Sequence, residues 1–91
     1  MMTKQMLRKI IGENIKRERT ARNLSVEELA GLMGITPAYV GLIERGERGT
    51  TVHNISKLSE IFSLSFEKFV QSGDGLSFGE DKTSSLNSKR N

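Results

Sequence analysis

Hydroxyl side chains stand at three positions from which a helix can hold a phosphate group. Ser25, Thr36 and Thr51 each precede a segment whose apolar residues recur at helical spacing. A hydroxyl at such a position accepts a hydrogen bond from the first helical turn, and the free N–H groups and positive dipole end beside it attract phosphate oxygens. Plain helix capping explains the same residues, and the two roles are compatible. These positions are therefore candidate phosphate contacts as well as helix starts.

Enzyme and metal chemistry have little to build on in this chain. His53 is the only histidine and there is no cysteine, so a zinc site lacks ligands and we expect His53 to face solvent. Glu27 and Glu28 are adjacent, so they point to different sides of a helix and cannot work as an acid–base pair. The later acidic residues lack the spacing of calcium ligands: Asp74, Glu80 and Asp81. We predict no catalytic site, no metal and no cofactor.

Positive charge gathers near the N-terminus. The net charge of the chain is +3, and seven basic residues precede Asn23 against two acidic ones. The basic residues of this segment are Lys4, Arg8, Lys9, Lys16, Arg17, Arg19 and Arg22. Such an excess favours a polyanionic partner, although a merely solvated helix face has the same composition.

The sequence predicts neither a membrane protein nor a secreted one. No apolar run approaches the about 20 residues that a membrane-spanning helix needs. The N-terminal segment MMTKQMLRKII lacks the long uncharged stretch and the cleavage site of a signal peptide. The absence of cysteine is compatible with a reducing compartment. We therefore expect a cytoplasmic protein with no membrane partner.

A short helix is predicted directly after Ser25. Ser25 and Glu28 have the spacing of a capping box, in which each side chain accepts a hydrogen bond from a backbone N–H group of the other end of the turn. Leu29, Ala30 and Met33 then form one apolar face, and Gly34 stands where the chain must leave the helix in a left-handed conformation.

A second helix is predicted to follow Thr36. Proline restrains Thr36 to extended dihedral angles that suit an N-cap, and Pro37 fits the first helical position because its missing N–H group is not needed there. This helix would bury Val40 and Ile43 and end at Gly46. Two short helices joined by a turn containing glycine form a helix-turn-helix unit, whose second helix commonly enters the major groove of DNA.

Helices are also expected on both sides of this unit. Residues 3–22 carry apolar side chains spaced by four, at Leu7, Ile11 and Ile15, with Ile10 beside them. Thr51 is expected to cap a fourth helix. The inner side of that helix is predicted to hold Val52, Ile55, Leu58, Ser59 and Phe62.

A fifth helix is expected to begin at the cap Ser65 and to carry Phe66, Phe69 and Val70. The fold class is therefore all-α, with five helices and no strand. We assign residues 1–71 to a helix-turn-helix domain. Residues 72–91 are rich in Ser, Gly and charge, which predicts a flexible polar tail with Leu76 and Phe78 as its only anchors.

Several segments in this order resemble the lambda-repressor-like, or Xre, family of small bacterial and phage DNA-binding proteins. They are IGENIKRERTARNLS at 11–25, SVEELAGLMGITPAYVGLIERG at 25–46, LIERGER at 42–48 and ISKLSEIFSLSFEKF at 55–69. LIERGER overlaps the end of the segment before it. The resemblance implies the compact five-helix fold of that family. It also implies a largely buried ion pair between Arg19 and Glu44 that ties the first helix to the third. A surface charge pair is the alternative.

The resemblance further implies two groups of contacts to double-stranded DNA. The helix at about residues 36–45 would lie in the major groove. The base-facing positions would be Thr36, Pro37, Ala38, Tyr39, Gly41 and Leu42. The phosphate contacts would be Ser25, Thr36, Tyr39, Arg48, Thr50 and Thr51.

Four of the base-facing positions carry no side-chain hydrogen-bonding group: Pro37, Ala38, Gly41 and Leu42. Paired hydrogen bonds to bases are unavailable from them, which leaves apolar contacts with thymine methyl groups and readout of DNA shape. We therefore expect modest selectivity from each half-site. Useful specificity then requires a homodimer on a palindromic operator, with half-sites about 34 Å apart.

The predicted function is a sequence-selective transcription regulator, and more specifically a repressor. Its dimer surface is predicted to be Leu64, Phe66, Phe69 and Val70, although these residues would also suit the core. An alternative is a protein-interaction module, such as an antitoxin-like or co-regulator subunit. It would capture a protein partner through an apolar patch of Val26, Leu32 and Leu42.

Overall fold

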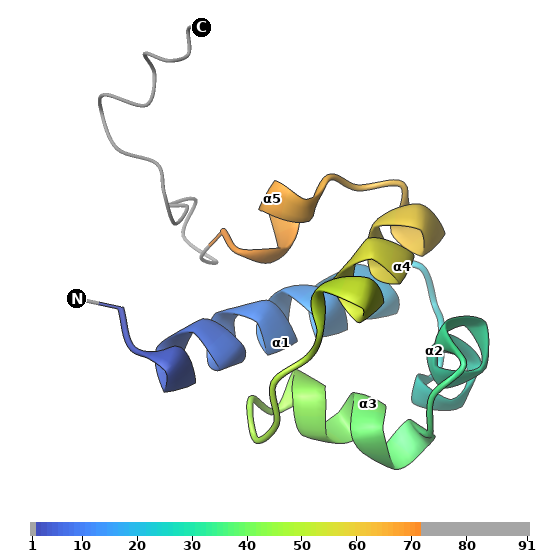
Figure 1. Cartoon of the computed structure of the whole chain (residues 1–91). Coiled ribbons are helices and arrows are strands. Elements are labelled where there is room, and N and C mark those ends of the chain that lie inside the picture. The colour runs from blue at the N-terminus through green and yellow to red at the C-terminus, as the bar shows by residue number, and fades with distance from the viewer. Residues whose placement is uncertain (1, 72–91) are drawn as a thin grey trace, which may run out of the picture.

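Five helices make up the part of the chain that the structure, a computed structural model, describes: residues 2–71 (Figure 1). They are α1 (Lys4–Ala21), α2 (Val26–Met33), α3 (Pro37–Glu44), α4 (Val52–Phe62) and α5 (Phe66–Phe69). Within these residues there is no strand, so the all-α, five-helix prediction is confirmed. The predicted tail at 72–91, with Leu76, Phe78 and the acidic residues Asp74, Glu80 and Asp81, lies outside the described residues.

The long helix α1 runs through the middle of the molecule, and the other helices are arranged around it. In Figure 1, α2 and α3 lie on one side of α1, and α5 lies on the other. α1 contacts both α3 and α5, while α2 contacts α3 and α4. α3 therefore rests on α1 and α2, and its remaining side is left open.

Local capping groups define the helix-turn-helix unit. The backbone N–H of Glu28 donates to Ser25 Oγ at 2.9 Å, and the N–H of Ser25 donates to the Glu28 carboxylate at 2.8 Å, so the predicted capping box is present. Gly34 ends α2 with φ +75°. Thr36 Oγ1 then accepts from the N–H of Tyr39 at 3.1 Å. The chain bends by 107° between α2 and α3, within the range typical of helix-turn-helix units.

The core is formed by the apolar faces of all five helices. Its members are Ile15, Leu29, Ala30, Met33, Val40, Ile43, Ile55, Leu58, Phe62 and Phe69. These include every residue predicted to be buried in α2 and α3. Thr51 caps α4 as predicted, accepting from the N–H of Asn54 at 3.0 Å.

Two predictions about α4 and α5 are wrong. Val52 was expected on the inner side of α4, but it is 78% exposed, because it is the first residue of the helix and the buried side of α4 begins in the following residues, with Asn54 and Ile55. Ser65 has the extended backbone of a cap, yet its side chain makes no capping hydrogen bond. α5 is a single turn of four residues, which packing of Phe69 holds in place.

Phe69 belongs to the interior of the monomer, which corrects its assignment to a dimer surface. Its side chain is fully buried and its ring lies 6.3 Å from the ring of Phe62. The buried amide of Asn14 donates to the carbonyl oxygens of Phe69 at 2.8 Å and Gln71 at 2.6 Å. These hydrogen bonds attach the end of α5 to the middle of α1.

Among residues 2–71, no single helix has the length and apolar character to cross a membrane. α2 and α3 reach that length only when taken together, across the 107° bend. The apolar residues that these two helices contribute are largely those buried in the core.

Candidate nucleic-acid interface

α3 packs against the protein with one face, and its opposite face is open to solvent. Val40, Ile43 and Glu44 are buried against the body of the protein. Of the residues predicted to face bases, the N-terminal ones are exposed: Thr36, Pro37 and Ala38. Gly41 and Leu42, one turn later, are half-buried. α3 thus has a usable outer face, and the base contacts themselves stay a prediction.

Tyr39 connects α3 to the loop that follows it. The ring is half-buried, and the hydroxyl donates to the carbonyl oxygen of Gly49 at 3.2 Å. The proton that a phosphate contact would require is therefore already used, whereas the phenolic oxygen can still accept a hydrogen bond. Tyr39 orders the loop in addition to its predicted contact with DNA.

Arg45 is a candidate DNA-reading residue that the sequence analysis missed. A Cβ placed on Gly41 would lie 3.1 Å from Arg45 Nη1, so the guanidinium group covers the glycine one turn earlier on the outer face of α3. Arg45 is exposed, and its Nε donates to Glu47 Oε2 at 2.9 Å. The sequence did hold a signal for Arg45: it lies four residues after Gly41, and residues four apart share one face of a helix. A guanidinium here supplies the donors that the predicted base-facing residues lack.

Apart from Tyr39, the predicted phosphate contacts fall into two groups. The exposed ones are Ser25, Thr36, Arg48 and Thr51. Three of these are also helix caps, so their hydroxyl oxygens already accept backbone N–H groups. Thr50 differs, because its Oγ1 is buried and has no hydrogen-bond partner within the described residues. A phosphate contact through the Thr50 hydroxyl would therefore require the loop to change, and this contact stays a prediction.

A close approach between α1 and the end of α3 sets the position of α3. Gly12 is buried in α1, and a Cβ added to it would lie 2.2 Å from the carbonyl oxygen of Ile43 and 2.6 Å from that of Glu44. Only glycine allows the two backbones to come this near. Nothing in the apolar pattern of residues 3–22 had pointed to this contact.

The Arg19–Glu44 ion pair implied by the family resemblance is present at the same junction. Arg19 Nε lies 2.7 Å from Glu44 Oε2, and Nη2 lies 3.0 Å from Oε1, so the two groups bind side by side. Both residues are buried. The hydrogen bond to Glu44 raises the pKa of Arg19 above its ordinary value, against the opposing effect of burial. Arg19 Nη1 also donates to the carbonyl oxygen of Leu24 at 2.8 Å.

The residues proposed for protein contacts are only partly exposed. In the predicted dimer surface Phe66 is 54% exposed, while Leu64 and Val70 are half-buried. In the alternative apolar patch Leu32 is 56% exposed, and Val26 and Leu42 are half-buried. Val26 packs against the core, so it adds little to a patch.

Metal-binding groups are not clustered in the described part of the chain. No three His, Cys, Asp or Glu side chains of residues 2–71 come together in a way that could hold an ion. His53 is exposed, as the sequence predicted.

The chain is similar to helix-turn-helix proteins in sequence and in structure. A family model described as helix-turn-helix matches residues 15–69. Control protein C.SmaI of Serratia marcescens is 33% identical over 64 residues, which cover 70% of this chain and 76% of that protein. The crystal structure of the restriction-modification controller protein C.AhdI from Aeromonas hydrophila matches with a TM-score of 0.64 at 35% identity, over 68% of this chain and 94% of that one.

A further similarity is to the crystal structure of SinR, the master regulator for biofilm formation, in complex with DNA. Its TM-score is 0.63 at 27% identity, over 67% of this chain and 98% of that one. The matched residues 15–69 contain the whole helix-turn-helix unit and the Arg19–Glu44 pair that holds it. The chain therefore belongs to the helix-turn-helix family of lambda-repressor-like, or Xre, DNA-binding transcription regulators.

Proposed function

We propose that this protein represses transcription by binding a palindromic operator as a homodimer, with α3 of each subunit in the major groove. The observation that carries the proposal is the open face of α3, over which the Arg45 guanidinium extends beside Gly41. An α-helix fits the major groove, where an arginine can make paired hydrogen bonds to guanine. The capped starts of α2, α3 and α4 offer N–H groups to the phosphates on either side.

Two similar proteins support this role. SinR is described as a regulator in complex with DNA, and C.AhdI as a controller protein. The junction of Gly12, Arg19 and Glu44 would hold α3 in a fixed position. A helix that reads DNA needs such a fixed position in order to distinguish one base from another.

A homodimer would explain how modest readout from one α3 helix gives useful specificity. Phe66 is an exposed aromatic residue beside the half-buried Leu64 and Val70. Exposed aromatic residues are typical of contact surfaces between proteins. We place the dimer contact on this surface, without Phe69.

Selection of bound sites from random DNA duplexes tests the proposal. We expect enrichment of a palindrome whose half-sites lie about 34 Å, or one helical turn, apart. The logarithm of the affinity for the selected duplex should fall linearly with the logarithm of the salt concentration. If no duplex is enriched and binding does not respond to salt, the proposal is wrong, and the protein-interaction alternative centred on Leu32 becomes the better explanation.

Arg45→Gln is expected to weaken operator binding by about tenfold or more, since loss of one paired arginine–guanine contact costs about 1–3 kcal/mol. Fluorescence anisotropy with the selected operator and with a scrambled duplex measures the change. The operator should lose more affinity than the scrambled duplex, because the lost contact reads a base. Lys16→Gln, which removes one charge from an exposed position on α1, is the control. Equal losses on the two duplexes would assign Arg45 to a phosphate instead.

Glu47→Gln is expected to tighten DNA binding several-fold. The Glu47 carboxylate holds Arg45 Nε at 2.9 Å and brings a negative charge to the surface that would approach phosphates. Both side chains are exposed, so loss of the ion pair should change the free energy of unfolding by less than about 1 kcal/mol. Anisotropy measures the affinity and urea unfolding measures the stability. Weaker binding would mean that Glu47 orients Arg45 productively rather than restraining it.

A further inference from the structure

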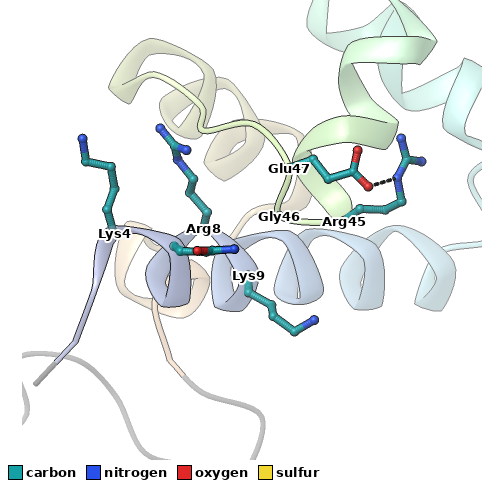
Figure 2. Close-up of a pocket in the computed structure, with 7 residues that line it drawn as sticks. Lys4, Arg8, Lys9, Arg45, Gly46 and Glu47 are labelled. Atoms are coloured by element: carbon teal, nitrogen blue, oxygen red, sulfur yellow. Dashed lines mark hydrogen bonds and ion pairs between the residues drawn. The ribbon is translucent and has the colours of Figure 1, made fainter.

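A basic pocket of about 580 Å³ lies between the N-terminal half of α1 and the loop that follows α3 (Figure 2). α1 contributes the cationic side chains of Lys4, Arg8 and Lys9 to its lining. The other wall is formed by Arg45, Gly46 and Glu47. In Figure 2 the side chains of Lys4 and Arg8 extend from α1 on the side where Glu47 lies.

Two glycines bring the loop onto α1. Gly46 has φ +76°, and a Cβ placed on it would lie 3.0 Å from the α-carbon of Lys9, so the loop rests directly on the helix backbone. A Cβ on Gly49 would lie 3.0 Å from Arg8 Nε. The Arg8 side chain therefore lies along the same loop that carries Arg48. The packing of Gly46 and Gly49 against α1 therefore fixes the position of these cations relative to α3.

The charge of the pocket is unbalanced toward the positive. Glu47 is its only carboxylate, and it binds Arg45. Among residues 2–71, neither Lys4, Arg8 nor Lys9 forms an ion pair. A cluster of this kind attracts an anion and repels a metal cation.

The pocket is continuous with the outer face of α3 through Arg45. This side chain lines the pocket and also covers Gly41 on the face predicted to read bases. The recognition helix of a helix-turn-helix unit contacts base edges mainly through its N-terminal residues. The C-terminal end of α3 and the loop after it would therefore lie nearer to the sugar–phosphate backbone.

We propose that the basic pocket is a second phosphate-binding site that takes a backbone phosphate of the bound DNA. This inference rests on the proposed function. It extends the DNA-binding surface beyond the helix-turn-helix unit to the first two turns of α1. Lys4 and Arg8 supply affinity that is independent of base sequence, because phosphates are the same at every step of the duplex. A free phosphorylated molecule has the same chemistry, but the continuity with α3 favours DNA.

The test compares the salt dependence of DNA binding among matched variants. Lys4→Gln and Arg8→Gln should each make the slope of log affinity against log salt shallower by about 0.9, and the double variant by about twice that amount. Affinity should fall several-fold on the operator and on a scrambled duplex alike. Lys16→Gln removes one charge from an exposed site on the same helix outside the pocket, and its slope should match that of the wild type. Circular dichroism confirms that each variant is folded.

A second measurement separates the two sources of phosphate. Inorganic phosphate and pyrophosphate are added to the DNA-free wild-type protein and to the double variant, and the melting temperatures are compared. If the double variant keeps the wild-type slope on DNA, the inference is overturned, and selective stabilisation of the wild type by pyrophosphate would then assign the pocket to a free phosphorylated molecule. If the wild type itself shows no salt-dependent DNA binding, the proposed function fails together with the inference. A shallower slope in the double variant with a steep wild-type slope supports both.

Discussion

Glu44→Ala is expected to lower the free energy of unfolding by about 3–5 kcal/mol, because it leaves the Arg19 guanidinium buried without its counter-charge. Two hydrogen bonds, at 2.7 and 3.0 Å, are lost with the carboxylate. Within residues 2–71, the hydrogen bond to the Leu24 carbonyl oxygen is then the one that the Arg19 side chain keeps. Urea unfolding followed by circular dichroism measures the change.

The exposed Arg45–Glu47 pair supplies the control for this prediction. Glu47→Ala breaks an ion pair of similar length, 2.9 Å, at the surface, and should change the stability by less than about 1 kcal/mol. If Glu44→Ala does not fold, Glu44→Gln, which keeps the shape and a hydrogen-bond acceptor, provides a measurable intermediate loss. Equal effects of Glu44→Ala and Glu47→Ala would contradict the structural role of the buried pair.

Gly12→Ala is expected to destabilise the protein by about 1–3 kcal/mol or more, because the added methyl group overpacks the contact between α1 and α3. The new Cβ would lie 2.2 Å from the Ile43 carbonyl oxygen. That oxygen belongs to the backbone, so relief requires movement of a whole helix. Since α3 would move, operator affinity should fall as well. Thermal and urea unfolding, together with anisotropy, measure the two effects.

Gly31→Ala makes the same substitution inside a helix where space is available. A Cβ at Gly31 meets nothing within 4 Å, and replacing a helical glycine by alanine stabilises by about 0.5–1 kcal/mol. The two variants should therefore change the stability in opposite directions. A Gly12→Ala protein as stable as the wild type would show that α1 and α3 are not in the close contact described.

The helix-turn-helix unit could be predicted from the sequence because its boundaries depend on neighbouring residues. Ser25 and Glu28 satisfy each other's backbone N–H groups within one turn. Gly34 needs only its own positive φ angle to end α2. Such signals operate over a few residues, so they do not depend on which other segments pack against the helix.

Burial at the ends of helices could not be predicted in the same way. Val52 and Phe69 are both apolar residues at the edge of a predicted helix, but Val52 is exposed and Phe69 is fully buried. The difference depends on which distant segment reaches each of them. Phe69 meets Phe62 and lies beside the Asn14 anchor, and no periodicity in residues 65–70 contains that information.

The candidate site was predicted in outline but not in its chemistry. Family resemblance identified the outer face of α3 and the Arg19–Glu44 pair. It did not identify Arg45, because the path of a long side chain over Gly41 depends on its rotamer and on the Glu47 carboxylate. Nor did it identify the basic pocket, which forms only when the loop rests on α1 at Gly46.

The hydrogen bond between Tyr39 and Gly49 places a natural optical probe on α3, the helix that we propose reads DNA. Tyr39 is the only tyrosine and the chain has no tryptophan, so all tyrosine fluorescence of the protein arises from that one ring. Its quantum yield depends on the partner of the phenolic hydroxyl, which here is the Gly49 carbonyl oxygen. Docking of a duplex against α3 would thus change the native fluorescence directly, and encounters with DNA could be timed in a stopped-flow instrument without attaching a dye.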